Sequence, residues 1–68
     1  MDIKISLAAA RVNAKLTQEE LAEKLGVSKS TVNGWEKGKS EPKLSQLQAI
    51  SALSGIPMDF IFVPIKTN

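Results

Sequence analysis

The sequence predicts an all-α fold, a compact domain of five short helices, and three observations support it. A chain of 68 residues is long enough for one small domain, because chains of this size bury only about 60% of their unfolded surface. The hydrophobic content of 43% and charged content of 24% are typical of a globular domain. Apolar residues recur at helical spacing between capping residues and glycines. The predicted helices span residues 6–14, 18–25, 29–37, 44–53 and 57–62, with a tail at 63–68 and a single domain over 1–68.

The first two helices follow from spacing and capping. One face of the segment 6–14 carries Leu7, Ala10, Arg11 and Ala14, at intervals of three and four. Thr17 and Glu20 match a capping box, in which each side chain accepts from the other residue's backbone amide, so Thr17 is the expected N-cap of the second helix. Gly26 suits the left-handed residue that ends such a helix.

The third helix begins almost at once, because Ser28 is a good N-cap and Gly38 marks the end. Val27 and Val32 occupy the two positions of a hydrophobic staple across this N-terminus. Two helices joined by a turn of three to four residues that contains a glycine form a helix-turn-helix. That unit can place its second helix in the major groove of DNA.

The last two helices are marked by apolar spacing and by a proline. In the fourth, apolar residues recur every three positions at Leu44, Leu47, Ile50 and Leu53, and Gly55 ends it. Pro57 suits the first position of a fifth helix, which we expect to run to residue 62.

Composition excludes several function classes. Histidine and cysteine are absent, which removes a Cys/His zinc site, a cysteine nucleophile and histidine acid–base chemistry. The serines lie in no nucleophile-elbow pattern, so we expect no enzyme, metal or cofactor. No apolar stretch approaches the roughly 20 residues that cross a bilayer, and no leader is visible. We therefore expect a cytoplasmic protein without a membrane partner, and its small helical domain leaves no room for a small-molecule ligand.

The segment TQEELAEKLGVSKSTVNGWEKGKSEP resembles the helix-turn-helix domain of the Cro and phage-repressor (XRE-like) family. The later segment LSQLQAISALSGIPMDFIF is similar to helices four and five of that family. The positions in register are Gln18, Ala22, Gly26, Val32, Trp35, Glu36, Gly38 and Pro42. The resemblance implies a five-helix, lambda-repressor-like DNA-binding domain.

In this family the start of the third helix reads base edges, which implies that role for Lys29, Ser30, Asn33 and Gly34. With Val32 and Trp35 inward, these positions point outward. Lysine donates to guanine O6 and N7, and asparagine pairs with adenine N6 and N7, so we expect a half-site that contains guanine. Gly34 has no side chain to touch a third base, and it is either a tolerated defect in the helix or a place where DNA or a neighbouring segment approaches closely.

Phosphate contacts are expected around the same helix. By resemblance and charge, the candidates are Thr17, Gln18, Thr31, Lys37, Lys39, Ser40 and Lys43. Residues 29–43 hold four lysines and two glutamates, which accounts for the whole net charge of +2. A carboxylate on this helix would repel phosphate unless it were engaged elsewhere. The resemblance implies that Arg11 pairs with Glu36 inside the domain, as a structural ion pair.

The resulting hypothesis is a sequence-specific transcriptional regulator that represses as a homodimer on a double-stranded DNA operator. Phe60, Phe62, Val63 and Ile65 are either C-terminal core or a dimer contact. The alternative is a protein-interaction module, such as an antitoxin-like partner, that uses the same fold to bind another regulator. Trp35 is expected to be a core residue that does not stack on DNA.

Overall fold

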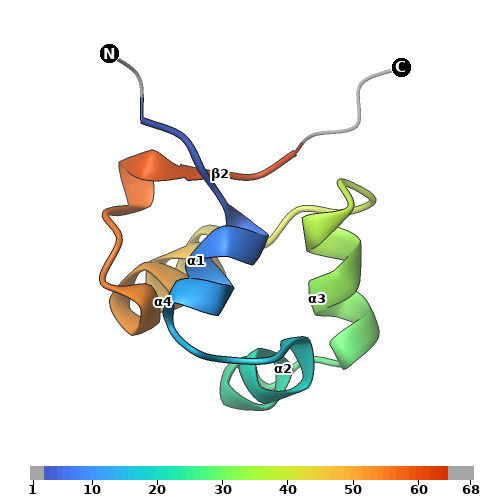
Figure 1. Ribbon diagram of the computed structural model, residues 1–68. Coiled ribbons are helices and arrows are strands. Elements are labelled where there is room, and N and C mark those ends of the chain that lie inside the picture. Colours follow the sequence, from blue (N-terminus) through green and yellow to red (C-terminus); the bar gives the residue numbers. More distant parts are fainter. Residues whose placement is uncertain (1–2, 65–68) are drawn as a thin grey trace.

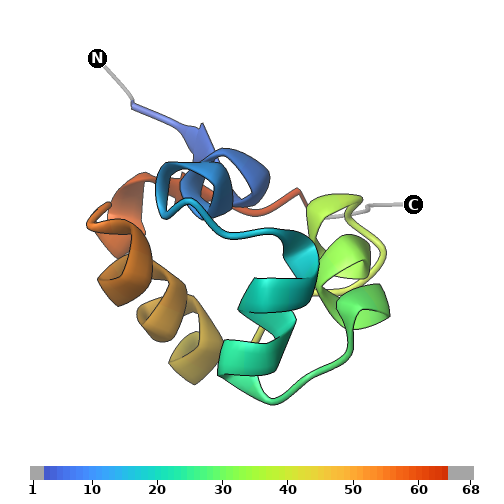
Figure 2. The same cartoon turned by 60° about the horizontal axis from the view of Figure 1, so that its bottom comes forward.

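The computed structural model describes residues 3–64 of the chain. The elements in order are β1 (Ile5–Ser6), α1 (Leu7–Asn13), α2 (Gln18–Leu25), α3 (Lys29–Glu36), α4 (Leu44–Ser54), a 3-10 turn η1 (Met58–Phe60) and β2 (Ile61–Phe62). Figures 1 and 2 show α2 next to α3, and α3 at the outer edge of the domain on the side away from α4. One broad face of α3 is therefore not covered by another helix.

The capping residues act as the sequence indicates in α2 and α3. Thr17 Oγ1 accepts a 3.0 Å hydrogen bond from the Glu20 amide, and Glu20 Oε1 accepts a 2.9 Å bond from the Thr17 amide. Ser28 Oγ accepts from the Thr31 amide at 3.1 Å. Gly26 ends α2 in the left-handed region, with φ of 70°. Helix α2 therefore has the predicted bounds, while α3 ends at Glu36, one residue before the predicted end.

The first helix is also slightly shorter than predicted, because Ser6 is its N-cap and Ala14 its C-cap. Ser6 Oγ accepts from the Ala9 amide at 3.0 Å, which satisfies a free N–H group in the first turn. Within the segment, Leu7 and Ala10 are buried, while Arg11 and Ala14 are only partly buried. The predicted apolar face thus packs into the core at its N-terminal end.

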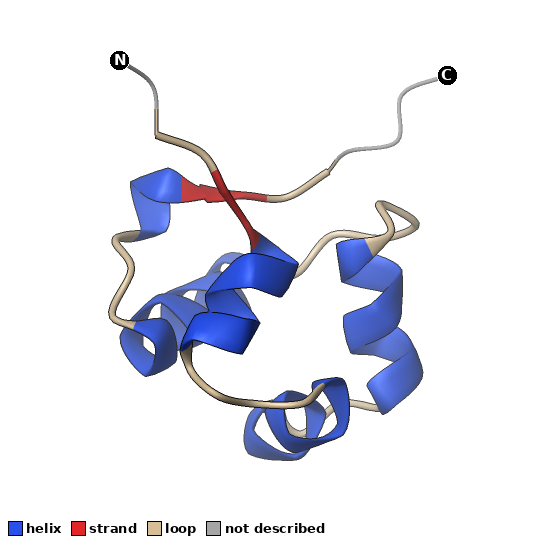
Figure 3. Ribbon diagram, in the orientation of Figure 1, coloured by secondary structure: helices blue, strands red, loops and turns tan. Residues whose placement is uncertain are grey.

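The prediction of a fifth α-helix is wrong. The described residues also contain two short strands, so the domain is mostly helical and not all-α. After Pro57 the chain makes a single 3-10 turn at Met58–Phe60 and then becomes extended. Ile61 pairs with Ile5 and Phe62 with Ser6 in a two-stranded parallel sheet, shown in red in Figure 3. β-branched and aromatic residues favour strands, and Ile61 in the strand is 8% exposed, within the core. The domain has four α-helices, a 3-10 turn and this sheet among its described residues.

The apolar residues that recur every three positions in α4 do not all face the core. Ile50 is buried, but Leu44 is 63% and Leu53 is 40% exposed. An α-helix turns about 100° per residue, so a three-residue repeat drifts by about 60° at each step. Over nine residues the drift places the two leucines on opposite sides of the helix. Helix α4 also continues to Ser54, one residue past the predicted end, and Ser54 is buried.

The core lies where α1, α2, α3, α4 and β2 meet. Its buried apolar residues are Leu7, Ala10, Leu21, Ala22, Val32, Trp35, Ile50 and Ile61. Trp35 is 2% exposed, so its ring is a core side chain and is not available to stack on a base. Ala22 is small and buried on α2, which lets α2 and α3 approach closely. Among residues 3–64, no helix is long and apolar enough to cross a membrane.

Candidate nucleic-acid interface

The turn between α2 and α3 sets the direction in which α3 leaves the domain. The Val27 amide donates to Ala22 O at 3.0 Å and the Gly26 amide donates to Glu23 O at 3.3 Å, which satisfies carbonyls at the end of α2. Val27 packs against the core, one residue before the Ser28 cap. The turn is therefore fixed by backbone hydrogen bonds on one side and by an apolar contact on the other.

The four predicted base-reading residues share the side of α3 that faces away from the core. Lys29 and Ser30 are exposed, while Asn33 and Gly34 are partly buried. Val32 and Trp35, on the opposite side, are buried. Because inward-facing side chains anchor the helix, the side chains of its first turn extend into solvent from a rigid backbone.

The predicted phosphate-contact residues lie at the start of α2, in the first turn of α3, and between the end of α3 and the start of α4. Thr31 Oγ1 lies 2.9 Å from Ser28 Oγ, so part of its hydrogen-bonding capacity is used within the helix start. Thr17 Oγ1 is used in the capping box of α2. The remaining exposed candidates follow α3 in the chain and are Lys37, Lys39, Ser40 and Lys43. Lys37 is the C-cap of α3 and the Lys39 amide bonds back to Gly34 O, so these two lysines lie at the end of α3, whereas Lys43 is the N-cap of α4.

The segment that approaches Gly34 is the chain's own loop. A Cβ placed on Gly34 would lie 3.2 Å from Ser40 Oγ, and the Lys39 amide donates to Gly34 O at 2.8 Å. The loop thus folds back on the C-terminal half of α3. The glycine leaves room for this loop, and the close approach that the sequence left open is explained by Ser40.

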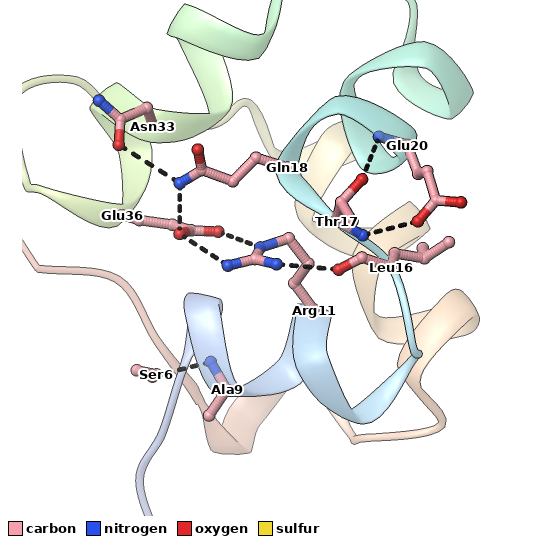
Figure 4. Close-up of polar contacts among 9 residues, drawn as sticks. All are labelled: Ser6, Ala9, Arg11, Leu16, Thr17, Gln18, Glu20, Asn33 and Glu36. Atoms are coloured by element: carbon pink, nitrogen blue, oxygen red, sulfur yellow. Dashed lines mark hydrogen bonds and ion pairs between the residues drawn. The ribbon is translucent and has the colours of Figure 1, made fainter.

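Glu36 is withdrawn from solvent by a forked ion pair. Arg11 Nε donates to Glu36 Oε2 at 2.7 Å and Arg11 Nη2 donates to Glu36 Oε1 at 3.3 Å. Arg11 Nη1 donates to Leu16 O at 2.8 Å, so the guanidinium also holds the segment before α2 (Figure 4). The two side chains are 15% and 8% exposed. The negative charge of α3 is therefore paired within the domain, as the resemblance implied.

Gln18 joins this cluster, a contact that the sequence did not predict. Its Nε2 donates to Glu36 Oε1 at 2.9 Å and to Asn33 Oδ1 at 3.3 Å (Figure 4). The amide group has two N–H hydrogens, and both are used. In this geometry the Gln18 side chain has no N–H left for a phosphate. This contact could have been anticipated from chemistry, because the largely buried Glu36 carboxylate needs hydrogen-bond donors for both of its oxygens.

The predicted dimer-contact residues lie near the sheet. Phe60 and Phe62 are 38% and 46% exposed, and the Lys4 ammonium lies 5.7 Å from the centre of the Phe62 ring. Val63 is partly buried and, with Pro42, Leu44 and Leu47, lines a shallow depression. Ile65 lies outside the described residues. Within residues 3–64, no group of three acidic, histidine or cysteine side chains is placed to hold a metal ion.

Comparisons with known proteins agree on the kind of domain. The family described as helix-turn-helix matches residues 7–61. The chain is 41% identical over 61 residues to the uncharacterized HTH-type transcriptional regulator MJ0272 of Methanocaldococcus jannaschii, covering 90% of this chain and 92% of that protein. It is 36% identical over 58 residues to the cryptic phage CTXphi transcriptional repressor RstR of Vibrio cholerae, covering 85% of this chain and 52% of RstR.

A third relative has a different name. The chain is 49% identical over 43 residues to the antitoxin HigA1 of Mycobacterium tuberculosis. The aligned region covers 63% of this chain and 29% of the antitoxin. The chain thus spans nearly all of one relative, about half of another and less than a third of the last. No solved structure gives a significant match to the chain.

Proposed function

The chain belongs to the helix-turn-helix family, and on that premise we propose that it is a sequence-specific DNA-binding transcriptional regulator that represses by occupying an operator as a homodimer. The names of two relatives support the regulatory part, since one is a transcriptional regulator of similar length and the other a phage repressor. Occupying a promoter is the simplest mechanism for a domain of this size, because it requires contacts only with DNA and with the second copy of the domain.

One observation carries the proposal: the outward side of α3 presents donors, while its carboxylate is paired internally. Lys29 and Ser30 are exposed in the first turn. Glu36, the only acidic residue on α3, is held by Arg11 at 2.7 Å and is 8% exposed. A helix with free donors and a neutralised carboxylate suits a groove lined by base acceptors and flanked by phosphates.

The proposed contacts divide into two sets. The proposed base-reading residues are Lys29, Ser30, Asn33 and Gly34, and Ser40 of the following loop lies against Gly34. The phosphate contacts are proposed at Thr17, Gln18, Thr31, Lys37, Lys39, Ser40 and Lys43. For Gln18 the donor is its backbone N–H in the first turn of α2, where helix geometry leaves amides free and the dipole favours an anion.

A selection experiment tests the proposal and identifies the operator at the same time. The purified protein is incubated with a pool of randomised DNA duplexes, and the bound fraction is amplified and sequenced over several rounds. We expect convergence on a pseudo-palindrome whose half-sites are about 34 Å apart, one helical turn. A pool that stays random at low salt would contradict sequence-specific binding, and a single half-site would contradict the dimer.

The dimer part has its own test. We propose that the exposed aromatic residues Phe60 and Phe62, with Val63 and Ile65, contact the second copy. Light scattering at micromolar protein, with and without the selected duplex, gives the mass. The double substitution F60S/F62S should yield a monomer, whereas V12S, at an exposed apolar residue of α1, should not change the mass. A wild-type monomer both free and on DNA would refute this contact.

A second function has one specific observation in its favour, the similarity to an antitoxin. In that case the domain binds another protein, and the partner is expected from a neighbouring gene. Co-expression with the neighbouring gene product should then give a complex that survives size-exclusion chromatography, while the DNA selection stays random. A converged pool together with no such complex favours the regulator.

A further inference from the structure

Gln18 lies between the Arg11–Glu36 ion pair and Asn33, a residue proposed to read a base. We propose that Gln18 is a positioning residue that holds the Asn33 amide in one orientation, so that α3 offers an N–H donor, and not a donor–acceptor pair, to the DNA. This inference rests on the proposed function, and it specifies which base edge Asn33 recognises: one that presents an acceptor, with guanine preferred over adenine.

The orientation of Gln18 follows from the chemistry of its neighbours. A guanidinium only donates hydrogen bonds and a carboxylate only accepts them. Glu36 Oε1 lies 2.9 Å from the Gln18 side chain, so Gln18 must turn its NH2 group toward it. The opposite orientation would place two acceptor oxygens at this distance inside a partly buried cluster, which costs free energy. The Glu36 carboxylate therefore determines which end of the Gln18 amide faces it.

The Gln18 amide in turn fixes the orientation of the Asn33 amide. The second hydrogen of Gln18 Nε2 points to Asn33 Oδ1 at 3.3 Å, and a nitrogen that only donates requires an oxygen there. The Asn33 nitrogen then faces the other way, as Figure 4 shows. Among the described residues it donates to no protein group, and so both of its N–H hydrogens remain available on the outer side of α3.

This arrangement changes the base that Asn33 is suited to read. Pairing with adenine uses the side-chain oxygen to accept from N6 and the nitrogen to donate to N7. With its oxygen held by Gln18, Asn33 offers donors to the groove, which match the O6 and N7 acceptors of guanine. The N6 amine of adenine would meet another donor. The adenine pairing that asparagine can make is therefore disfavoured at this position, and guanine is preferred.

The test begins by finding the base pair concerned. Starting from the selected duplex, Asn33→Ala should lose selectivity at one position, which identifies it. Gln18→Met keeps the length of the side chain but removes both donors, so the Asn33 amide is free to turn. We expect the preference for guanine over adenine at that position to fall about tenfold, with other positions unchanged. Gln48→Met, the same substitution at an exposed residue of α4, should leave every position unchanged.

A second variant covers the case in which Gln18→Met does not fold. Asn33→Asp keeps an oxygen for Gln18 but has no N–H, so it should fold and lose the preference for guanine. A preference for guanine that persists in either variant overturns the inference. A selected base that is adenine in the wild-type protein overturns it as well.

The hydrogen bonds are also measurable without DNA, which separates this inference from the proposed function. In NMR spectra of the free protein, the Gln18 side-chain NH2 hydrogens should exchange with water more slowly than those of exposed Gln48. Equal exchange overturns the inference whatever the DNA result. Slow exchange with no selected duplex refutes the proposed function and the base preference together, whereas a selected duplex with unchanged preference in Gln18→Met refutes the base preference alone.

Discussion

Arg11 on α1 and Glu36 at the end of α3 are joined by two hydrogen bonds, 2.7 Å from Nε to Oε2 and 3.3 Å from Nη2 to Oε1. The pair ties the first helix directly to the helix proposed to enter the groove. It also removes a negative charge from the side of the domain that would face phosphate. If the proposed function holds, folding and DNA binding depend on the same contact.

Removing one member of this pair should destabilise the domain. Arg11→Ala leaves the Glu36 carboxylate in a mostly buried position with only Gln18 as a donor, and Leu16 O loses its donor as well. Loss of one partner of a buried pair costs about 3 to 5 kcal/mol. Urea unfolding followed by circular dichroism measures it, with Lys24→Ala on the exposed side of α2 as the control. Equal midpoints for the two variants would show that the pair contributes little.

The capping box of α2 should give a stability contribution that depends on pH. The Thr17 backbone N–H donates to the Glu20 carboxylate and lowers its pKa below the ordinary value of 4.5. A carboxyl whose pKa is lower in the folded state stabilises that state above its unfolded pKa, and this contribution is lost as the pH falls through the folded pKa. Unfolding midpoints taken from neutral pH down to about pH 3 should therefore fall less in Glu20→Gln than in the wild-type protein. A Glu19→Gln variant, changed at the adjacent exposed residue, should behave like wild type, and identical pH profiles for all three proteins would contradict the capping role.

Gly34 should tolerate alanine, with a gain that depends on Ser40. Alanine improves helix propensity by up to about 1 kcal/mol, but its Cβ would lie 3.2 Å from Ser40 Oγ. Because Ser40 is exposed, its hydroxyl can rotate away at small cost. Thermal unfolding should show a small stabilisation by Gly34→Ala alone and a larger one in a Ser40→Ala background. Destabilisation in both backgrounds would mean that the backbone of the loop, and not the hydroxyl, occupies the space.

Two lysines should affect DNA binding in different ways. Lys29→Ala should cost about 1 to 3 kcal/mol and relax selectivity at one base pair, because Lys29 is proposed to contact a base edge. Lys39→Ala should weaken all duplexes alike and reduce the slope of log K against log salt by about 1. Fluorescence anisotropy with single-base variants of the selected duplex separates the two patterns. Uniform weakening by both substitutions would remove Lys29 from the base-reading set.

Local chemistry made some elements predictable. The bounds of α2 depend on Thr17, Glu20 and Gly26, which lie within or next to the helix, and the structure has them as predicted. β2 depends on pairing with Ile5 and Ser6, more than fifty residues earlier in the chain, which no local pattern encodes. The three-residue repeat in α4 does not mark a single face, because helical geometry rotates its two ends apart.

In the candidate site, too, some features follow from local sequence and others depend on long-range packing. That Lys29 and Ser30 face outward follows from the buried Val32 and Trp35 on the same helix. The ion pair came from the family resemblance, because nothing in the spacing connects residues 11 and 36. The need of the Glu36 carboxylate for a further donor could be foreseen, but that Gln18 supplies it and also bonds Asn33 depends on how α2 packs on α3.

The proposed function requires that the outer side of α3 reads a DNA sequence. The ratio of dissociation constants for the selected duplex and a scrambled duplex of the same composition, measured by anisotropy at physiological salt, tests this requirement. A sequence-specific regulator should bind the selected duplex at least about a thousandfold more tightly, and its affinity should fall steeply as salt is raised. A ratio near one, or no binding to either duplex at low salt, would contradict the claim.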